Sequence, residues 1–197
     1  MGRELHRADP IAAGVLMKFT ELAISGVWVV EPEVRADERG FFARTVCAEE
    51  FSKQDLPANY CQSSISYNHC RGTLRGMHYQ AAPSLEQKLV RCTQGAIYDV
   101  VLDLRPSSPT FKKWVAAELS ATNRLALAVP HGCAHGFITL ADGSEVLYMM
   151  SEAQNAALAT GVRWNDPQFS ISWPLQPVVI SERDAQYPDF SGVAAAK

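Results

Sequence analysis

One nine-residue stretch, GTLRGMHYQ at 72–80, holds two side chains that could act together in chemistry. The imidazole of His78 titrates near neutral pH and can accept a proton, and the guanidinium of Arg75 can bind an anion. In a β-strand, residues three apart point to opposite faces unless a bulge or a glycine kink intervenes. Gly76 lies between them, so we predict a break there that brings both side chains to one pocket.

Cationic residues follow this stretch along the chain. Lys88 and Arg91 come soon after Arg75, and buried cations are costly unless they meet an anion. If these side chains share one interior with His78, the missing anion is a ligand. A lone strand histidine more often serves as a structural hydrogen-bonder, so the cations are what favour a binding pocket.

Three further residues are candidates for the site only if other polar side chains lie beside them. His135 lies in PHGCAHGF (130–137), a turn-rich segment that enters an apolar strand, whereas we expect its neighbour His131 to face solvent. Tyr148 is by itself typical of a core tyrosine with its hydroxyl at the rim. Asp184, in ISERDAQYPDF, is by itself an ordinary loop acid.

The residues do not favour a metal or a cofactor. Metal sites in β-barrels commonly use two histidines one residue apart, but the position two beyond His78 is Gln80. The sequence has no G-x-S-x-G, no cysteine in a nucleophile context and no Gly-rich phosphate loop. We therefore expect no metal and no cofactor.

The composition is that of one ordinary globular domain. Of 197 residues, 47% are hydrophobic and 20% charged, and the formal net charge is −3, so no strong field favours nucleic acid. No run reaches the roughly 18 apolar residues of a membrane helix, and no cleavage site follows the apolar run at 11–17. We expect one domain over 17–197 after a disordered extension at 1–16. Five cysteines without a CxxC pair indicate a reducing, cytoplasmic setting.

Short apolar-alternating runs, separated by turn residues, predict an all-β sandwich or barrel. The runs lie at 26–34, 40–46, 88–95, 96–104, 112–120, 124–130, 136–140 and 145–151. Helix is expected only at 47–56 and at 151–161, where Ser151 and Gln154 have capping-box spacing and Gly161 suits the position after the C-cap.

The run at 97–104 has one apolar and one partly acidic face, because residues in a strand alternate. Asp99 and Asp103 share the acidic face. Two interpretations stay open for Asp103: a solvated outer face, or an acidic wall inside a ligand-binding barrel.

Eight segments in order over about 20–190 resemble the dTDP-4-dehydrorhamnose 3,5-epimerase family, a metal-free branch of the cupins. They are DERGFFART, GTLRGMHYQ, KLVRC, AIYDVVLDLRPSSPTF, VPHGCAHGF, EVLY, VRWNDP and ISERD. The resemblance implies a jelly-roll barrel (a double-stranded β-helix) with a few short peripheral helices, acting as a homodimeric isomerase. The implied reaction is proton abstraction at the carbons that flank a 4-keto group of a nucleotide-linked 6-deoxyhexose, followed by reprotonation on the other face.

The resemblance also implies roles for individual residues. His78 matches the base and Asp184 the acid that pairs with it, while Tyr148 matches the proton donor and Lys88 the cation near the keto oxygen. The positions that match substrate contacts are Arg39, Gln62, Arg75, His135 and Arg183. Arg39 and Arg75 suit the diphosphate best, because a guanidinium can bind two oxygens at once.

Three positions depart from the family pattern. Gln154 stands where an aromatic residue usually stacks on the base, so either base binding is weaker or the base stacks elsewhere, on Tyr79 or Tyr60. Arg44 replaces a substrate-side glutamate and reverses its charge, whereas Arg183 replaces a lysine and keeps its sign.

These departures leave other functions open. A mono-epimerase at C3 or C5, or an epimerase for another nucleotide sugar, would keep the same chemistry. A non-catalytic sugar-binding cupin would have no need for a base opposite an acid, and a metal-dependent cupin oxygenase would require bound metal.

Overall fold

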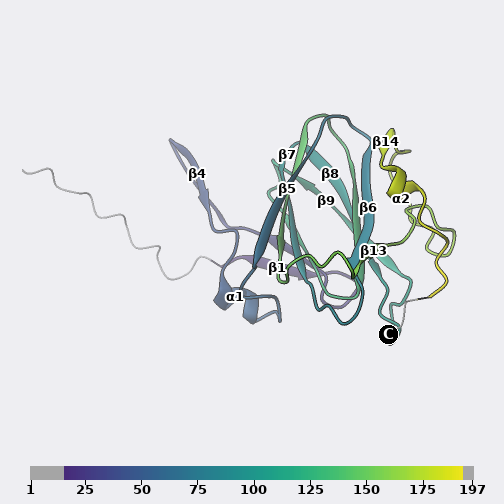
Figure 1. The fold of residues 1–197 in the computed structure, drawn as a ribbon. Helices are drawn as coiled ribbons and strands as arrows, with labels where there is room; N and C mark the ends of the chain where they lie inside the picture. Colours follow the sequence, from purple (N-terminus) through teal and green to yellow (C-terminus); the bar gives the residue numbers. More distant parts are fainter. Residues whose placement is uncertain (1–15, 193–197) are drawn as a thin grey trace, which may run out of the picture.

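The computed structural model describes residues 16–192 and folds into two sheets that face each other (Figure 1). The first sheet has the strand order β1 (Lys18–Glu21), β2 (Trp28–Glu31), β10 (Ala126–Val129), β7 (Lys88–Gln94), β12 (Ser144–Met150), β5 (Gln62–Asn68). The second has the order β13 (Ala159–Gly161), β6 (Thr73–Gln80), β11 (Cys133–Thr139), β8 (Ala96–Asp103), β9 (Trp114–Ser120), with β14 (Val179–Ile180) parallel to β6. The expected all-β jelly roll is confirmed.

The main core lies between the two sheets, because each strand turns alternate side chains inward. Val90 and Val146 from the first sheet meet Val101 and Phe137 from the second, and all four are fully buried. This interior is apolar over much of its length, so the polar groups described below are exceptions that need partners.

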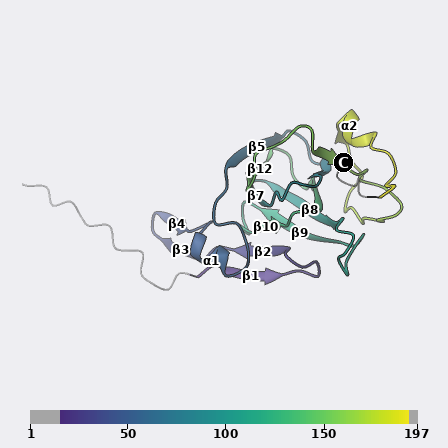
Figure 2. The ribbon, with the colours of Figure 1, turned by 60° about the horizontal axis from the view of Figure 1, so that its bottom comes forward.

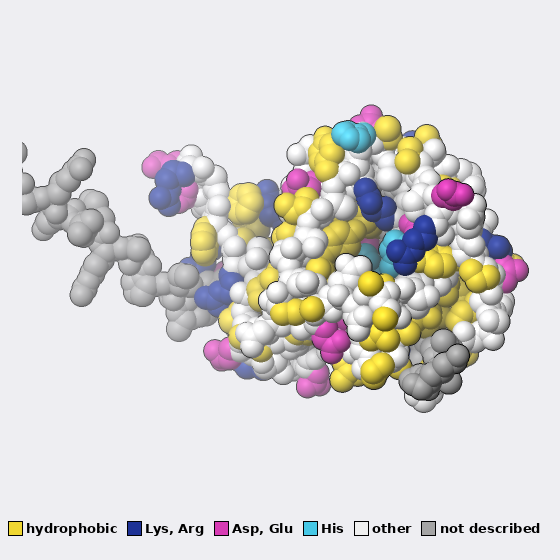
Figure 3. All heavy atoms as spheres, viewed as in Figure 1, with side chains coloured by type: hydrophobic (Ala, Val, Ile, Leu, Met, Phe, Trp, Pro, Cys, Tyr) yellow, Lys and Arg dark blue, Asp and Glu magenta, His cyan; other side chains and the backbone are white. Residues whose placement is uncertain are grey.

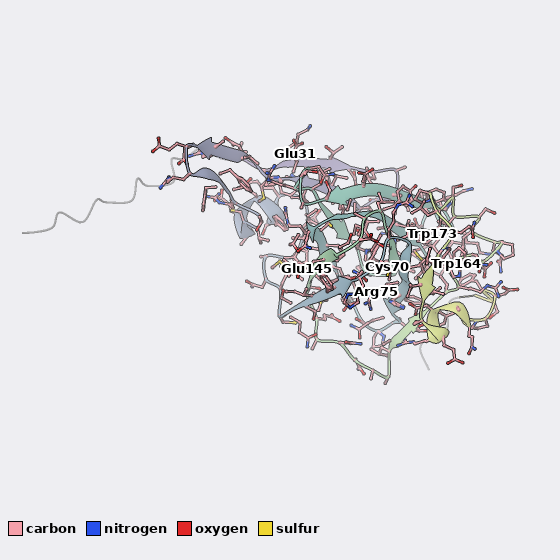
Figure 4. All side chains as sticks on the ribbon, turned by 90° about the horizontal axis from the view of Figure 1, so that it is seen from above. Glu31, Cys70, Arg75, Glu145, Trp164 and Trp173 are labelled. Atoms are coloured by element: carbon pink, nitrogen blue, oxygen red, sulfur yellow. The ribbon has the colours of Figure 1, made fainter. Side chains whose placement is uncertain are left out.

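Each sheet also has its outer face covered. On the first sheet, α1 (Ala48–Ser52) packs Phe51 into a cluster, while the chain after β13 covers the second sheet with Phe169 and Phe190. Figure 2 shows α1 and the chain that carries α2 (Glu182–Ala185) on opposite sides of the barrel. Within this cover, Trp173 Nε1 donates to the carbonyl of Trp164 at 2.9 Å (Figure 4).

The helix expected at 47–56 is confirmed as the shorter α1, but the one expected at 151–161 is wrong. The Ser151 hydroxyl accepts from the backbone N–H of Gln87 at 2.8 Å, and the N–H of Asn155 donates to Gln80 Oε1 at 2.7 Å. The end of the segment then joins β6 as β13. Contacts to distant residues therefore outweigh the helix propensity of its alanines.

The acidic face of β8 is fully buried, so a solvated outer face for Asp103 is wrong. Asp103 accepts hydrogen bonds from Arg105, Ser108 and Thr110. These contacts occupy its carboxylate and hold the chain that follows β8. Asp99 faces the barrel interior and belongs to the site described below.

A two-stranded hairpin, β3 (Val34–Asp37) and β4 (Gly40–Ala43), projects from the barrel (Figure 1). Its Phe41 and Phe42 are exposed.

Residues 1–15 and 193–197 lie outside the described residues. The extension predicted at 1–16 falls in this part of the chain except for Leu16, so the domain bounds stay predictions. Over residues 16–192, no helix is long and apolar enough to span a membrane.

Candidate active site

Two cavities adjoin at His78, one between the two sheets and one along β6, β14 and α2. One of about 320 Å³ is lined by residues of both sheets, including His78, Lys88 and Tyr148, and one of about 380 Å³ includes Arg75 and Asp184. His78 and Arg183 line both. Figure 3 shows histidine and Lys or Arg side chains gathered around a hollow in this face. The four predicted catalytic residues therefore lie around these adjoining cavities, in company with Arg75 and Arg183.

The break predicted at Gly76 is confirmed. His78 lies opposite His135 and Arg75 lies opposite Phe137, so β6 has one more residue than β11 over this span. Gly76 has a φ of +135°, and a Cβ there would lie 2.5 Å from the Cα of Gly136. This bulge turns both Arg75 and His78 to one cavity, and Figure 4 places Arg75 beside the C-terminal segment.

His78 is paired with Asp184, which comes from far along the chain. The parallel pairing of β14 with β6 brings α2 against β6, and Ser181 caps α2 by accepting from the N–H of Asp184 at 3.1 Å. Asp184 Oδ1 lies 2.7 Å from His78 Nε2, and its Oδ2 accepts from the N–H of Gly76 at 3.2 Å. Burial alone would raise the pKa of Asp184, but the hydrogen bonds from His78 and Gly76 outweigh it and lower the pKa. Asp184 is therefore a carboxylate that can hold His78 and stabilise its imidazolium.

Lys88 and Tyr148 face the cavity from the opposite wall. They lie on the neighbouring strands β7 and β12, where Tyr148 is directly across from Val90. Burial raises the pKa of Tyr148, so its hydroxyl keeps its proton at neutral pH. Lys88 Nζ lies 3.3 Å from Glu86 Oε2. This wall thus offers a hydroxyl donor and a cation.

His135 lies behind the cavity lining rather than in it. Its side chain is buried, its Nε2 is 2.6 Å from Asp99 Oδ1, and its ring packs edge-on against Tyr148 with centroids 6.2 Å apart. His135 and Asp99 therefore form a buried pair that supports the tyrosine, while the predicted substrate contact of His135 stays a prediction.

The predicted substrate contacts of the chain are dispersed. Gln62 lies at the rim, where its Oε1 accepts from the N–H of Gln154 at 2.8 Å. Arg39 lies in the turn of the projecting hairpin and pairs with Asp37 rather than lining either cavity. Arg91 belongs to neither cavity: it lines a separate pocket of about 220 Å³ and donates to the carbonyl of Arg124, so it does not share an interior with His78.

The departures from the family pattern have different surroundings. Arg44 pairs with Glu50 beside α1, with Nη1 to Oε1 at 3.1 Å, away from both cavities. Gln154 and Tyr79 line the cavity that holds Lys88, whereas Tyr60 packs edge-on against Phe51 outside the barrel. Tyr60 therefore cannot offer a stacking surface to a ligand beside His78.

Sequence reasoning missed several lining residues, of which Glu86 is the charged one. Glu86 precedes β7 and lines the cavity two residues before Lys88. The signal was present, because alternate residues of an extended chain share a face. In the part of the chain that the structure describes, no three His, Cys, Asp or Glu side chains are grouped as a metal site.

A jelly-roll cavity with a histidine and its carboxylate on one wall, and a lysine and a tyrosine on the other, defines a cupin-type enzyme of acid–base chemistry. The family model described as dTDP-4-dehydrorhamnose 3,5-epimerase matches residues 21–192. The chain belongs to this family, and the resemblance seen in its sequence is confirmed.

Relatives match over most of both chains. The dTDP-4-dehydrorhamnose 3,5-epimerase of Pseudomonas aeruginosa is 41% identical over 177 residues, 89% of this chain and 97% of the relative. The Bacillus anthracis enzyme of the same name, solved with TDP and PPi bound, has a TM-score of 0.85 at 38% identity and covers 88% of this chain and 99% of its own. ChmJ, a 3'-monoepimerase from Streptomyces bikiniensis solved with dTDP-quinovose, has a TM-score of 0.77 at 32% identity and covers 85% of each chain.

Proposed function

We propose that the chain epimerises a nucleotide-linked 4-keto-6-deoxyhexose at C3 and C5, converting dTDP-4-dehydro-6-deoxy-D-glucose to dTDP-4-dehydro-L-rhamnose. The observation that carries this proposal is the placement of His78 on one sheet and Tyr148 on the other, across one cavity, with Asp184 of α2 paired to His78. Inversion at carbon needs a base and an acid on opposite faces of the sugar ring. Family membership supports the same reaction.

In the proposed reaction, His78 removes the proton from the carbon beside the ketone, and the C–H electron pair forms an enolate. Asp184 stabilises the resulting imidazolium at 2.7 Å. The Lys88 ammonium stabilises the negative enolate oxygen. Tyr148 then gives its hydroxyl proton to the opposite face of the same carbon, and water re-protonates the tyrosinate while His78 returns its proton to solvent.

The substrate's diphosphate would bind the guanidinium groups beside His78. Arg75 and Arg183 line the adjoining cavity, which has two cations and the single carboxylate of Asp184 among its lining residues. Arg75 Nε already donates to Asn68 Oδ1 at 2.7 Å, which leaves its Nη groups for phosphate. His135 would act from behind Tyr148, and Gln62 at the rim.

A homodimer would explain the position of Arg39. This residue lies outside its own chain's cavities, in the turn of a hairpin that projects from the barrel with Phe41 and Phe42 exposed (Figure 1). In a dimer, the hairpin could bury these rings against a second copy and bring Arg39 to that copy's cavity. All five cysteines are free thiols, which suits the reducing cytoplasm that we propose as its location.

Deuterium incorporation from heavy water into dTDP-4-keto-6-deoxyglucose tests the proposal, with NMR and mass readout. Wild-type protein should label C3 and C5, His78→Ala should label neither, and His131→Ala, at an exposed histidine, should label both like the wild type. Label at one carbon would show a mono-epimerase, the reaction named for ChmJ. No label with any 4-keto sugar nucleotide would favour a non-catalytic sugar-binding cupin.

A further inference from the structure

Glu86 faces the same cavity as the residues of the proposed reaction, although nothing in that reaction uses it. Its side chain is 7% exposed, and that of Lys88 is 17% exposed. Glu86 Oε2 lies 3.3 Å from Lys88 Nζ, and both residues line the cavity with His78 and Tyr148. A carboxylate so well buried requires a partner, and Lys88 is the partner it has.

The backbone around Glu86 is fixed to the segment that follows the neighbouring strand β12. Glu152 accepts from the Ser84 hydroxyl at 2.7 Å and from the N–H of Leu85 at 3.2 Å. On the other side of Glu86, the N–H of Gln87 donates to the Ser151 hydroxyl at 2.8 Å. Glu86 is therefore held from both directions, and its carboxylate has a fixed position from which to hold an ammonium.

The ammonium of Lys88 has three N–H donors on a flexible stem, so one contact to a fixed carboxylate limits where the other two can point. The opposite wall uses the same arrangement, because Asp184 holds His78. The proposed base and the proposed enolate-stabilising cation thus each have a carboxylate of their own.

We propose that Glu86 is a positioning residue that holds the Lys88 ammonium toward the substrate's keto oxygen. This inference rests on the proposed function, since it is there that Lys88 stabilises an enolate. Without the carboxylate, the ammonium samples several rotamers, and the loss falls on the step in which charge develops on oxygen.

Glu86→Gln tests the proposal in two backgrounds, wild type and Lys88→Met. In the wild-type background kcat should fall by about 10- to 100-fold while KM changes by less than about twofold. In the Lys88→Met background the same substitution should change kcat by less than about twofold, because there is no ammonium to position. Glu31→Gln, which removes the partner of Lys18 in an exposed Lys–Glu pair, should leave both constants unchanged.

Two outcomes would overturn the proposal. An equal fall in kcat in both backgrounds would mean that Glu86 acts on the substrate directly, and a rise in KM at constant kcat would mean that it contributes only to binding.

A wild type without any exchange would refute the proposed function, and thermal unfolding would then test the contact alone. Because removing one partner leaves a buried unpaired charge, the double variant should lose less in Tm than the sum of the single variants. Additive losses would refute the ion pair.

Discussion

Asp184→Asn isolates what the carboxylate contributes to the proposed base. Asp184 is 4% exposed and accepts from two donors, His78 Nε2 at 2.7 Å and the N–H of Gly76 at 3.2 Å. Asparagine has the same shape but one acceptor oxygen, so its amide group must turn N–H toward one of the two donors. The substitution therefore removes a charge and leaves a buried donor without an acceptor.

The two losses can be estimated separately. Opposite charges about 4 Å apart interact by about 4 kcal/mol at an effective dielectric constant of about 20. The His78 side chain is 39% exposed, so solvent screening reduces this to about 1–2 kcal/mol. An unsatisfied buried donor costs about 1–3 kcal/mol more. If most of the sum acts on the transition state, kcat falls by about 10²- to 10³-fold.

The assay is the rate of deuterium uptake at C3 and C5, measured at saturating substrate so that it reports kcat. KM should change little, because the imidazolium forms only after the substrate has bound. Asp189→Asn is the matched control, since Asp189 is an exposed acid paired with Arg163 on the same C-terminal segment. A rate within about threefold of the wild type would refute the role given to Asp184.

Three further predictions concern the fold and the ligand. Asp103→Asn should lower the free energy of unfolding by about 3–5 kcal/mol at pH 7, because it breaks a buried ion pair. Burial alone would raise the pKa of Asp103, but its hydrogen bonds lower the pKa. The stabilisation is therefore complete above the unfolded pKa of about 3.9 and declines as the pH falls toward the folded pKa. In urea unfolding, the variant should lose less free energy of unfolding at pH 3 than at pH 7, and an equal loss would contradict the role given to the ionised Asp103. Gly76→Ala should lower Tm much more than Gly40→Ala. Both glycines have a φ of at least +130°, but only at position 76 would the new Cβ lie 2.5 Å from a backbone atom, the Cα of Gly136. Equal losses in thermal unfolding would show that the backbone angle alone decides the effect. Gln154→Tyr should tighten dTDP binding by about tenfold in calorimetry through stacking, and unchanged affinity would mean that the base does not reach this rim.

The strands from β7 to β12 could be predicted because each carries its own signal, whereas β1, β5, β13 and β14 were not predicted. Alternating runs bounded by turn residues marked β7 through β12, and the opposed faces of β8 follow from the pleat alone. The bulge in β6 was also predictable, because Gly76 separates two residues whose chemistry requires a common side. Local sequence decides these features, so local reasoning finds them.

Features that depend on distant partners could not be found this way. Asp184 resembles a loop acid until β14 brings it to His78 across 106 positions of sequence. The segment 151–161 has helical composition, but the backbone N–H of Asn155 donates to the side chain of Gln80 in β6. The projecting position of Arg39 depends on where a hairpin leaves the barrel, which alternation does not specify.

The division of the site between two sheets restricts how this barrel can vary. Lys88 and Tyr148 belong to β7 and β12, which pair directly, so the proposed cation and proton donor form one unit, whereas His78 belongs to β6 in the other sheet. Because the side-chain period of a strand is two, a shift of one residue in β12 would turn Tyr148 out of the cavity and bring Leu147 in. β12 is held on both sides, by β5 and β7. The fold therefore fixes the register of the donor strand, while the glycine bulge in β6 orients the base independently on the facing wall.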